Sequence, residues 1–89
     1  MNTESKIVLI NAALQEFFKK NPGKGIQPAK DFMPLFIEKG IFTKDHRSGL
    51  PIRQVLRELD AENQLHRIPY VRAEHKQKNT FWYFAPLST

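Results

Sequence analysis

The sequence predicts an α+β fold in which a three-helix core is followed by a C-terminal β-hairpin. Apolar residues recur at helical spacing in three segments, which predicts three amphipathic helices. Near the C-terminus, two runs rich in β-branched and aromatic residues are joined by a short polar stretch, which is the pattern of a hairpin. A chain of 89 residues is too short to divide into two units with separate cores, so residues 1–89 are expected to form a single domain.

The first helix is predicted over Thr3 to Lys20, with Glu4 in its first turn. Its apolar stripe consists of Ile7, Ile10, Leu14, Phe17 and Phe18. Val8 and Leu9 lie outside this stripe, so the helix either packs on two sides or forms the contact of a homodimer.

A turn over Asn21 to Gly25 leads into a short extended piece at residues 25–27. The second helix is expected to start near Asp31, because Pro34 is tolerated only in a first turn, and to end at Gly40. Its inward-facing residues are predicted to be Phe32, Leu35, Phe36 and Ile37. A surface loop, residues 41–49, follows and is pinned by its first two residues, Ile41 and Phe42.

The third helix has the clearest pattern, with Pro51 near its first position and Glu62 near its end. The buried stripe is predicted to be Ile52, Val55, Leu56 and Leu59. Asn63 is expected to end the helix in the left-handed conformation. Two strands, Leu65 to Glu74 and Thr80 to Pro86, then form the hairpin. Pro69 cannot donate to a ladder and is expected at an edge or bulge.

The expected order of elements is α-β-α-α-β-β, which is that of a winged helix-turn-helix domain. The segment 52–68, IRQVLRELDAENQLHRI, resembles the recognition helix and first wing strand of many bacterial winged-helix regulators, in which "LRELEAEG" runs into "LIxR". The likeness covers residues 50–72 at the level of the motif. Two features depart from it: Asn63 replaces the usual Gly, and residues 40–49 form a longer connection than a simple helix-turn-helix has. The resemblance implies that the third helix binds DNA.

The outward face of the third helix carries Arg53, Gln54, Arg57 and Ala61. Arg can pair bidentately with guanine and Gln with adenine in the major groove, so the N-terminal half of this face suits base recognition. The second half is acidic, with Glu58, Asp60 and Glu62, which favours an approach by the N-terminal half. Two alternatives are a solvated helix face and a surface that binds another protein.

Further basic residues are expected to contact the DNA backbone. Arg67 and Arg72 lie in the first hairpin strand and Lys76 and Lys78 at the tip, while Arg47 and Ser48 precede the third helix. The tip lysines have an alternative role in discouraging edge pairing, and Ser48 an alternative role as a helix cap. The run 81–84, Phe-Trp-Tyr-Phe, is a less favoured stacking platform for single strands, because at least half of its side chains should fill the core.

The composition narrows the class of protein. The net charge of +5 favours polyanionic partners. Cysteine is absent and the three histidines, His46, His66 and His75, are scattered, so no metal site, cofactor or catalytic grouping is expected, and the chain is not predicted to be an enzyme. No segment is apolar enough for a membrane, and a cytoplasmic location is expected.

The sequence therefore predicts a double-stranded DNA-binding module, a small transcriptional regulator with its third helix in the major groove and its basic wing on the backbone. A winged-helix adaptor that binds proteins without affinity for DNA is the alternative. A binder of single strands or RNA is the third hypothesis.

Overall fold

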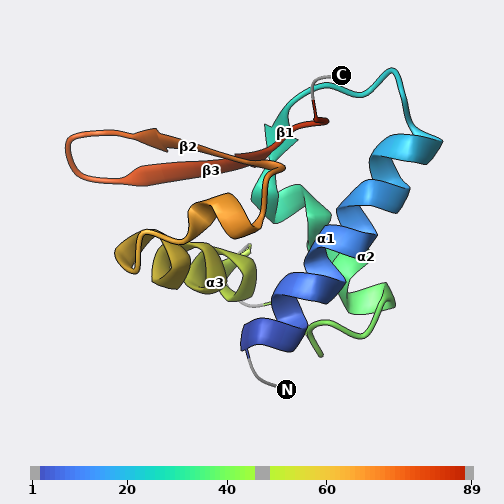
Figure 1. The fold of residues 1–89 in the computed structure, drawn as a ribbon, viewed down its shortest axis with the longest axis horizontal. Coiled ribbons are helices and arrows are strands. Elements are labelled where there is room, and N and C mark those ends of the chain that lie inside the picture. The colour runs from blue at the N-terminus through green and yellow to red at the C-terminus, as the bar shows by residue number, and fades with distance from the viewer. Residues whose placement is uncertain (1–2, 46–48, 88–89) are drawn as a thin grey trace.

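The computed structural model describes residues 3–45 and 49–87 (Figure 1). The described elements, in chain order, are α1 (Thr3–Lys20), β1 (Gln27–Pro28), the 3₁₀ turn η1 (Ala29–Phe32), α2 (Met33–Glu38), α3 (Leu50–Ala61), the 3₁₀ turn η2 (Leu65–Arg67), β2 (Val71–His75) and β3 (Thr80–Phe84). Three α-helices and one small antiparallel sheet make this part of the chain an α+β structure, which confirms the predicted class at that level.

Helix α1 has the bounds that the sequence predicts, Thr3–Lys20. Four residues of its predicted stripe are buried and the fifth, Phe17, is half-buried. At its C-terminal end, Asn21 donates to the Phe17 carbonyl oxygen from both its backbone N, at 2.9 Å, and its Nδ2, at 2.8 Å, so that Asn21 caps the last turn. Val8 is 66% exposed, and the homodimer, one of the two alternatives for this helix, stays a prediction.

The sheet has the strand order β1-β3-β2, and both pairs are antiparallel. Strand β1 has two residues, Gln27 and Pro28, which lie opposite Phe84 and Tyr83 of β3. The chain then turns into η1. On the β1 side of β3, residues 80–82 therefore have no neighbouring strand in the described part of the chain.

The first hairpin strand is shorter than predicted. Leu65–Arg67 form a 3₁₀ turn and β2 begins at Val71, so the expectation that the strand starts at Leu65 was wrong for residues 65–70. Pro69 lies in the turn before β2 and not within the strand. The alternation of apolar residues in this segment reflects core packing of the turn, since Ile68 is fully buried. The second strand, Thr80–Phe84, ends two residues before the predicted Pro86.

The second helix is also shorter than predicted. Residues 29–32 form the 3₁₀ turn η1, and α2 starts at Met33 with Pro34 in its first turn. Met33 is buried and the predicted Leu35 and Ile37 are half-buried, because the preceding 3₁₀ turn rotates the buried face relative to a helix starting at Asp31. Phe32 and Phe36 are buried as predicted.

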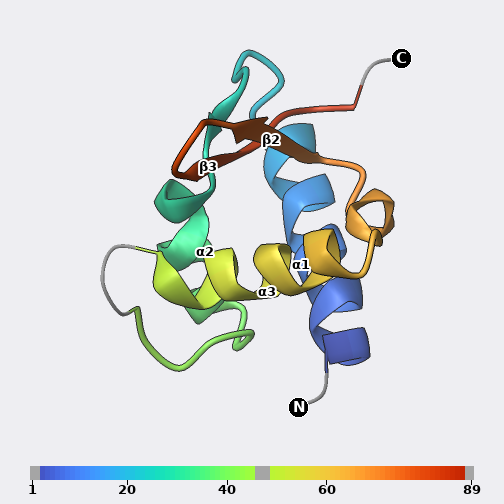
Figure 2. The same cartoon turned by 90° about the vertical axis from the view of Figure 1, so that its left-hand side faces the viewer.

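The core joins all three helices to the base of the sheet. The four predicted inward residues of α3 are buried, and Asn63 has the expected left-handed conformation, with φ of 59°. Phe84 packs edge-on against Phe32 and Phe36, at ring-centre distances of 5.3 and 6.0 Å. These contacts fix one end of β3 to the helical body, and the rest of the hairpin projects beside α3 (Figures 1 and 2).

The connection between α2 and α3 begins on two anchors. Ile41 and Phe42 are both buried, which confirms the predicted attachment of this loop. At its other end, the Gly49 backbone N donates to Asp45 Oδ1 at 2.8 Å, and the Gly49 carbonyl oxygen accepts from the Arg53 backbone N at 3.0 Å. Arg47 and Ser48 lie outside the described residues. None of the helices in residues 3–45 and 49–87 is long and apolar enough to cross a membrane.

Candidate nucleic-acid interface

A groove of about 900 Å³ lies between α3 and the β2–β3 hairpin, which stands above α3 in Figure 2. Pro28 and Lys30, at the junction of β1 and η1, also line it. Its charged lining consists of five cations and one carboxylate: Lys30, Arg53, Arg57, Lys76, Lys78 and Asp60. The groove thus gathers positive charge from three parts of the sequence.

The α3 wall carries two of the predicted site residues. Arg57 is exposed and faces the groove. Arg53 also lines the groove but is half-buried, and its Nε donates to the Gly49 carbonyl oxygen at 3.4 Å. Gln54 is exposed on α3 outside the groove, so it stands on the adjoining outward face. On α3, Arg57 and Gln54 are therefore exposed, whereas Arg53 is half-buried and hydrogen-bonded to the backbone.

The hairpin wall carries the two tip lysines. Lys76 and Lys78 are both exposed and both line the groove. Lys76 Nζ is 3.3 Å from Glu74 Oε1, an exposed pair that is worth little in water. Arg72 is not part of this wall, because its Nη1 donates to the carbonyl oxygens of Pro69 and Val71 at 2.8 and 2.9 Å. The structure therefore brings the tip lysines to α3 but leaves Arg72 apart from them.

Lys30 is a groove residue that the sequence reasoning missed. It follows β1 in η1, a turn that the pattern of apolar residues does not reveal. The β1–β3 pairing places Pro28 opposite Tyr83, and this brings the neighbouring Lys30 to the groove. Lys30 is a single basic residue near Pro28, and no sequence pattern indicated that it would lie at the groove.

The single carboxylate in the groove has a partner. Asp60 Oδ2 lies 3.3 Å from His75 Nε2, a contact that is an ion pair only when His75 is protonated. His75 also contacts the Trp82 ring edge-on, at a centre distance of 6.5 Å. The contact joins the C-terminal half of α3 to the hairpin.

The aromatic run, residues 81–84, alternates between buried and more exposed side chains. Trp82 and Phe84 are buried, which confirms that half of the run fills the core. Phe81 is 46% exposed and Tyr83 is half-buried, and both border the groove, as does the buried Trp82. The alternation of side chains along a strand accounts for this division.

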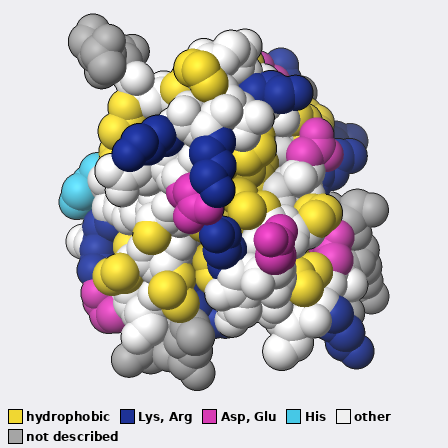
Figure 3. Space-filling view, turned by 90° about the vertical axis from the view of Figure 1, so that its right-hand side faces the viewer, with side chains coloured by type: hydrophobic (Ala, Val, Ile, Leu, Met, Phe, Trp, Pro, Cys, Tyr) yellow, Lys and Arg dark blue, Asp and Glu magenta, His cyan; other side chains and the backbone are white. Residues whose placement is uncertain are grey.

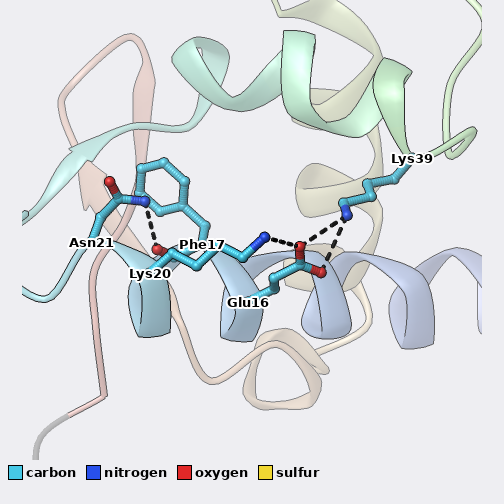
Figure 4. A network of polar contacts seen from close by, with 5 residues as sticks. All are labelled: Glu16, Phe17, Lys20, Asn21 and Lys39. Carbon is cyan, nitrogen blue, oxygen red and sulfur yellow. Dashed lines mark hydrogen bonds and ion pairs between the residues drawn. The ribbon is translucent and has the colours of Figure 1, made fainter.

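Outside the groove, two carboxylates of α1 form ion pairs with basic side chains. On α1, Glu16 contacts Lys20 at 2.9 Å and Lys39 at 3.1 Å (Figure 4), and hydrogen bonds from these two ammonium groups lower the pKa of Glu16. At the start of α1, Glu4 pairs with Arg67 of η2, and the hydrogen bond from that guanidinium lowers the pKa of Glu4.

Among the described residues, the face turned away from the hairpin has no comparable gathering of one sign of charge. Figure 3 shows basic and acidic side chains interspersed there. The apolar side chains on this face are also scattered rather than joined in one large patch. The groove is therefore the better candidate for a polyanion.

Residues 3–45 and 49–87 contain no group of three or more His, Cys, Asp or Glu side chains that could hold a metal ion. Comparison of the chain with protein-family models, with curated proteins and with solved structures gave no match. The function proposed for the groove accordingly depends on its geometry and charge.

Proposed function

We propose that the chain is a winged-helix domain that binds double-stranded DNA through α3 and the β2–β3 hairpin. The observation that supports this most strongly is the convergence of five cations from η1, α3 and the hairpin on one groove. The one carboxylate among the described lining residues, Asp60, is in contact with His75. Polyanion binding is favoured where Lys and Arg gather on one surface without competing acids.

The topology supports the winged-helix assignment. The described chain follows the order α-β-α-α-β-β, and its sheet has the order β1-β3-β2 with the hairpin at the C-terminal end. In such a domain the third helix enters the major groove, which is about 12 Å wide and admits a helix. The hairpin then stands beside the same stretch of backbone.

The proposed contacts divide into two kinds. Gln54 and Arg57, exposed on α3, contact base edges and supply sequence preference. Lys30, Lys76 and Lys78 contact phosphates of the strand that passes between α3 and the hairpin, and supply affinity without sequence information. Arg53 stiffens the start of α3 through Gly49 and contributes positive charge to the same strand.

A titration with duplex DNA at two salt concentrations tests the proposal. Arg57→Ala should weaken binding by about 5-fold or more, the lower end of the effect of losing one base-contacting Arg. Lys78→Ala should weaken binding to different sequences alike and reduce the slope of log affinity against log salt by about 1.

Lys24→Ala is the matched control, because Lys24 is an exposed cation outside the groove. It should leave both the affinity and the salt slope close to those of the unaltered protein. Absence of duplex binding at low salt, or an equal loss in the Lys24 variant, would refute the proposal.

A further inference from the structure

The β2–β3 hairpin has one face that no described helix covers. Trp82 and Phe84 are buried, so the face of β3 that carries them is the core face. Side chains alternate along a strand, and Phe81 and Tyr83 therefore leave the opposite face, which we call the outer face. In Figures 1 and 2, α3 lies on one side of the hairpin and no described helix lies on the other side. The outer face is thus turned away from α3.

The strand register identifies the other residues of the outer face, because directly paired residues share a face of the sheet. On β2, Arg72 lies opposite Tyr83, and Glu74 lies opposite Phe81. On β1, Pro28 lies opposite Tyr83. The outer face therefore has an apolar strip along β3 and β1, with one cation and one anion beside it on β2.

The apolar strip is accessible. Phe81 is 46% exposed, and Tyr83 and Pro28 are half-buried. Neither ring contacts another aromatic ring in the described part of the chain. Ile26, which directly precedes β1, is 59% exposed. Two of the four strongly exposed large hydrophobic side chains of residues 3–45 and 49–87 thus lie on or next to this sheet, and adjoining exposed apolar side chains are typical of a contact surface.

The two charged residues of the outer face are arranged along the strand in a directional way. Arg72 and Glu74 are exposed and stand two positions apart on β2, or about 7 Å. Arg72 Nη1 donates to the carbonyl oxygens of Pro69 and Val71, which draws the guanidinium away from the hairpin tip. Glu74 Oε1 lies 3.3 Å from Lys76 Nζ, which draws the carboxylate toward the tip.

We propose that the outer face binds a second copy of this chain, with the two hairpins packed face to face and antiparallel about a two-fold axis that passes midway between Arg72 and Glu74. Each Arg72 then faces Glu74 of the other copy, and their opposite displacements along β2 bring the two charged groups to the same level. Each Tyr83 faces Phe81 of the other copy. A parallel arrangement is disfavoured because it sets like charges against each other.

The size of the outer face suits a reversible dimer. The hairpin ladder is five residue pairs long, which gives a contact of about 17 Å along the strands. Such a face is smaller than the roughly 800 Å² per partner of a standard stable interface, so we expect dimers only at micromolar concentrations and above. An unrelated apolar partner would cover the strip but has no need for the ordered pair of charges. The inference is independent of the proposed DNA binding, because α3 lies on the other side of the sheet.

Sedimentation equilibrium at low salt, from micromolar to millimolar concentration, tests the inference. The average mass should rise from the monomer value of 10.4 kDa toward twice that value. Arg72→Glu and Glu74→Arg should each weaken self-association by about 5-fold or more, because each sets like charges against each other. The double variant should regain the association of the unaltered protein. An equal mixture of the two single variants should associate more tightly than either alone, because every acidic position then faces a basic one.

Phe81→Lys should weaken self-association by about 5-fold or more, since it removes the ring that faces Tyr83 of the other copy. Val8→Lys is the matched control, because Val8 is 66% exposed but lies on α1. It should associate like the unaltered protein, and thermal unfolding should show that every variant is folded. A monomer at millimolar concentration, or single charge variants that associate as tightly as their mixture, would overturn the inference. Loss of association in Val8→Lys but not in Phe81→Lys would place the contact on α1 and overturn it as well.

Discussion

Gly49 connects three parts of the molecule at one backbone position. Its φ is +95°, in the left-handed region where a side chain is strained. A Cβ built on it would lie 2.5 Å from Lys30 Cβ and 2.9 Å from Lys30 Cα, so η1 packs directly on its backbone. Its N and O also bond to Asp45 and Arg53. Gly49 therefore sets how closely the start of α3 approaches the groove residue Lys30.

We expect Gly49→Ala to be strongly destabilising, by roughly 2–4 kcal/mol, because backbone strain and a steric clash add. Gly40→Ala should cost about 1 kcal/mol, since Gly40 has φ of +76° but open space around its Cβ position. Gly23→Ala, with open space and no such φ, should have little effect. The free energy of unfolding of each variant is measured by urea denaturation. An equal loss at all three positions would contradict the expected ranking.

Two ion pairs tie α1 to its neighbouring elements. Glu4 pairs with Arg67 of η2, and Glu16 pairs with Lys39 just after α2. In both cases the basic partner lowers the glutamate pKa below its ordinary value of 4.5. A lowered pKa in the folded state contributes stability above the ordinary value, and this contribution is lost as the pH falls through the folded-state pKa.

The protein should therefore lose thermal stability as the pH falls below about 5, and a Glu4→Gln, Glu16→Gln double variant should lose less over the same window. Both pairs are solvent-exposed, so the difference is small and is best measured as the change in Tm with pH. Glu58→Gln is the control, because Glu58 forms no ion pair in the described part of the chain. A control variant as acid-resistant as the double variant would contradict the assignment.

The hairpin is the element whose position depends most on contacts made far from its tip. Phe84 attaches the base of β3 to Phe32 and Phe36, and His75 approaches Asp60 of α3. Between these contacts, β2 and β3 form a five-residue ladder from Val71–Phe84 to His75–Thr80. The tip lysines are therefore carried on a strand pair held at its base and near its outer end.

The whole molecule depends on one cluster of buried side chains. Its members come from α1, η1, α2, α3 and the sheet, so removing any large one affects the attachment of several elements. The Cα radius of gyration is 12.3 Å, as expected for a compact domain of this length. Net stabilities of about 0.05–0.15 kcal/mol per residue leave a small domain little margin.

Leu56→Ala should lower the free energy of unfolding by about 2–5 kcal/mol, because Leu56 is fully buried in this cluster. Val8→Ala should change it by less than about 0.5 kcal/mol, since Val8 is exposed. Both variants should unfold in one urea transition with the same denaturant slope. Two separate transitions in the unaltered protein would refute the single-domain prediction.

Local patterns in the chain were sufficient to predict α1, α3 and several exposed cations. Helical spacing of apolar residues such as Ile10 and Leu14 predicts α1. The same spacing around Leu56, with Pro51 at the start and Asn63 at the end, predicts α3. These signals are local, because each acts within about one turn of helix. The same patterns failed at Leu65–Arg67 and at Ala29–Phe32. There, apolar residues follow packing against distant elements, which short-range periodicity does not record.

The residues of the groove were also predictable from the sequence only in part. The basic character of Arg57 and Lys78 could be read from the chain. Alternation along a strand predicted that at least half of residues 81–84 fill the core, but not that Phe81 is exposed and Trp82 buried. The meeting of Arg57 and Lys78 in one groove with Lys30 could not be read from the chain, because it depends on β1 pairing with β3 and on His75 reaching Asp60. Local sequence determines which side chains a segment offers to solvent. Long-range pairing and core packing decide which of those side chains face one another.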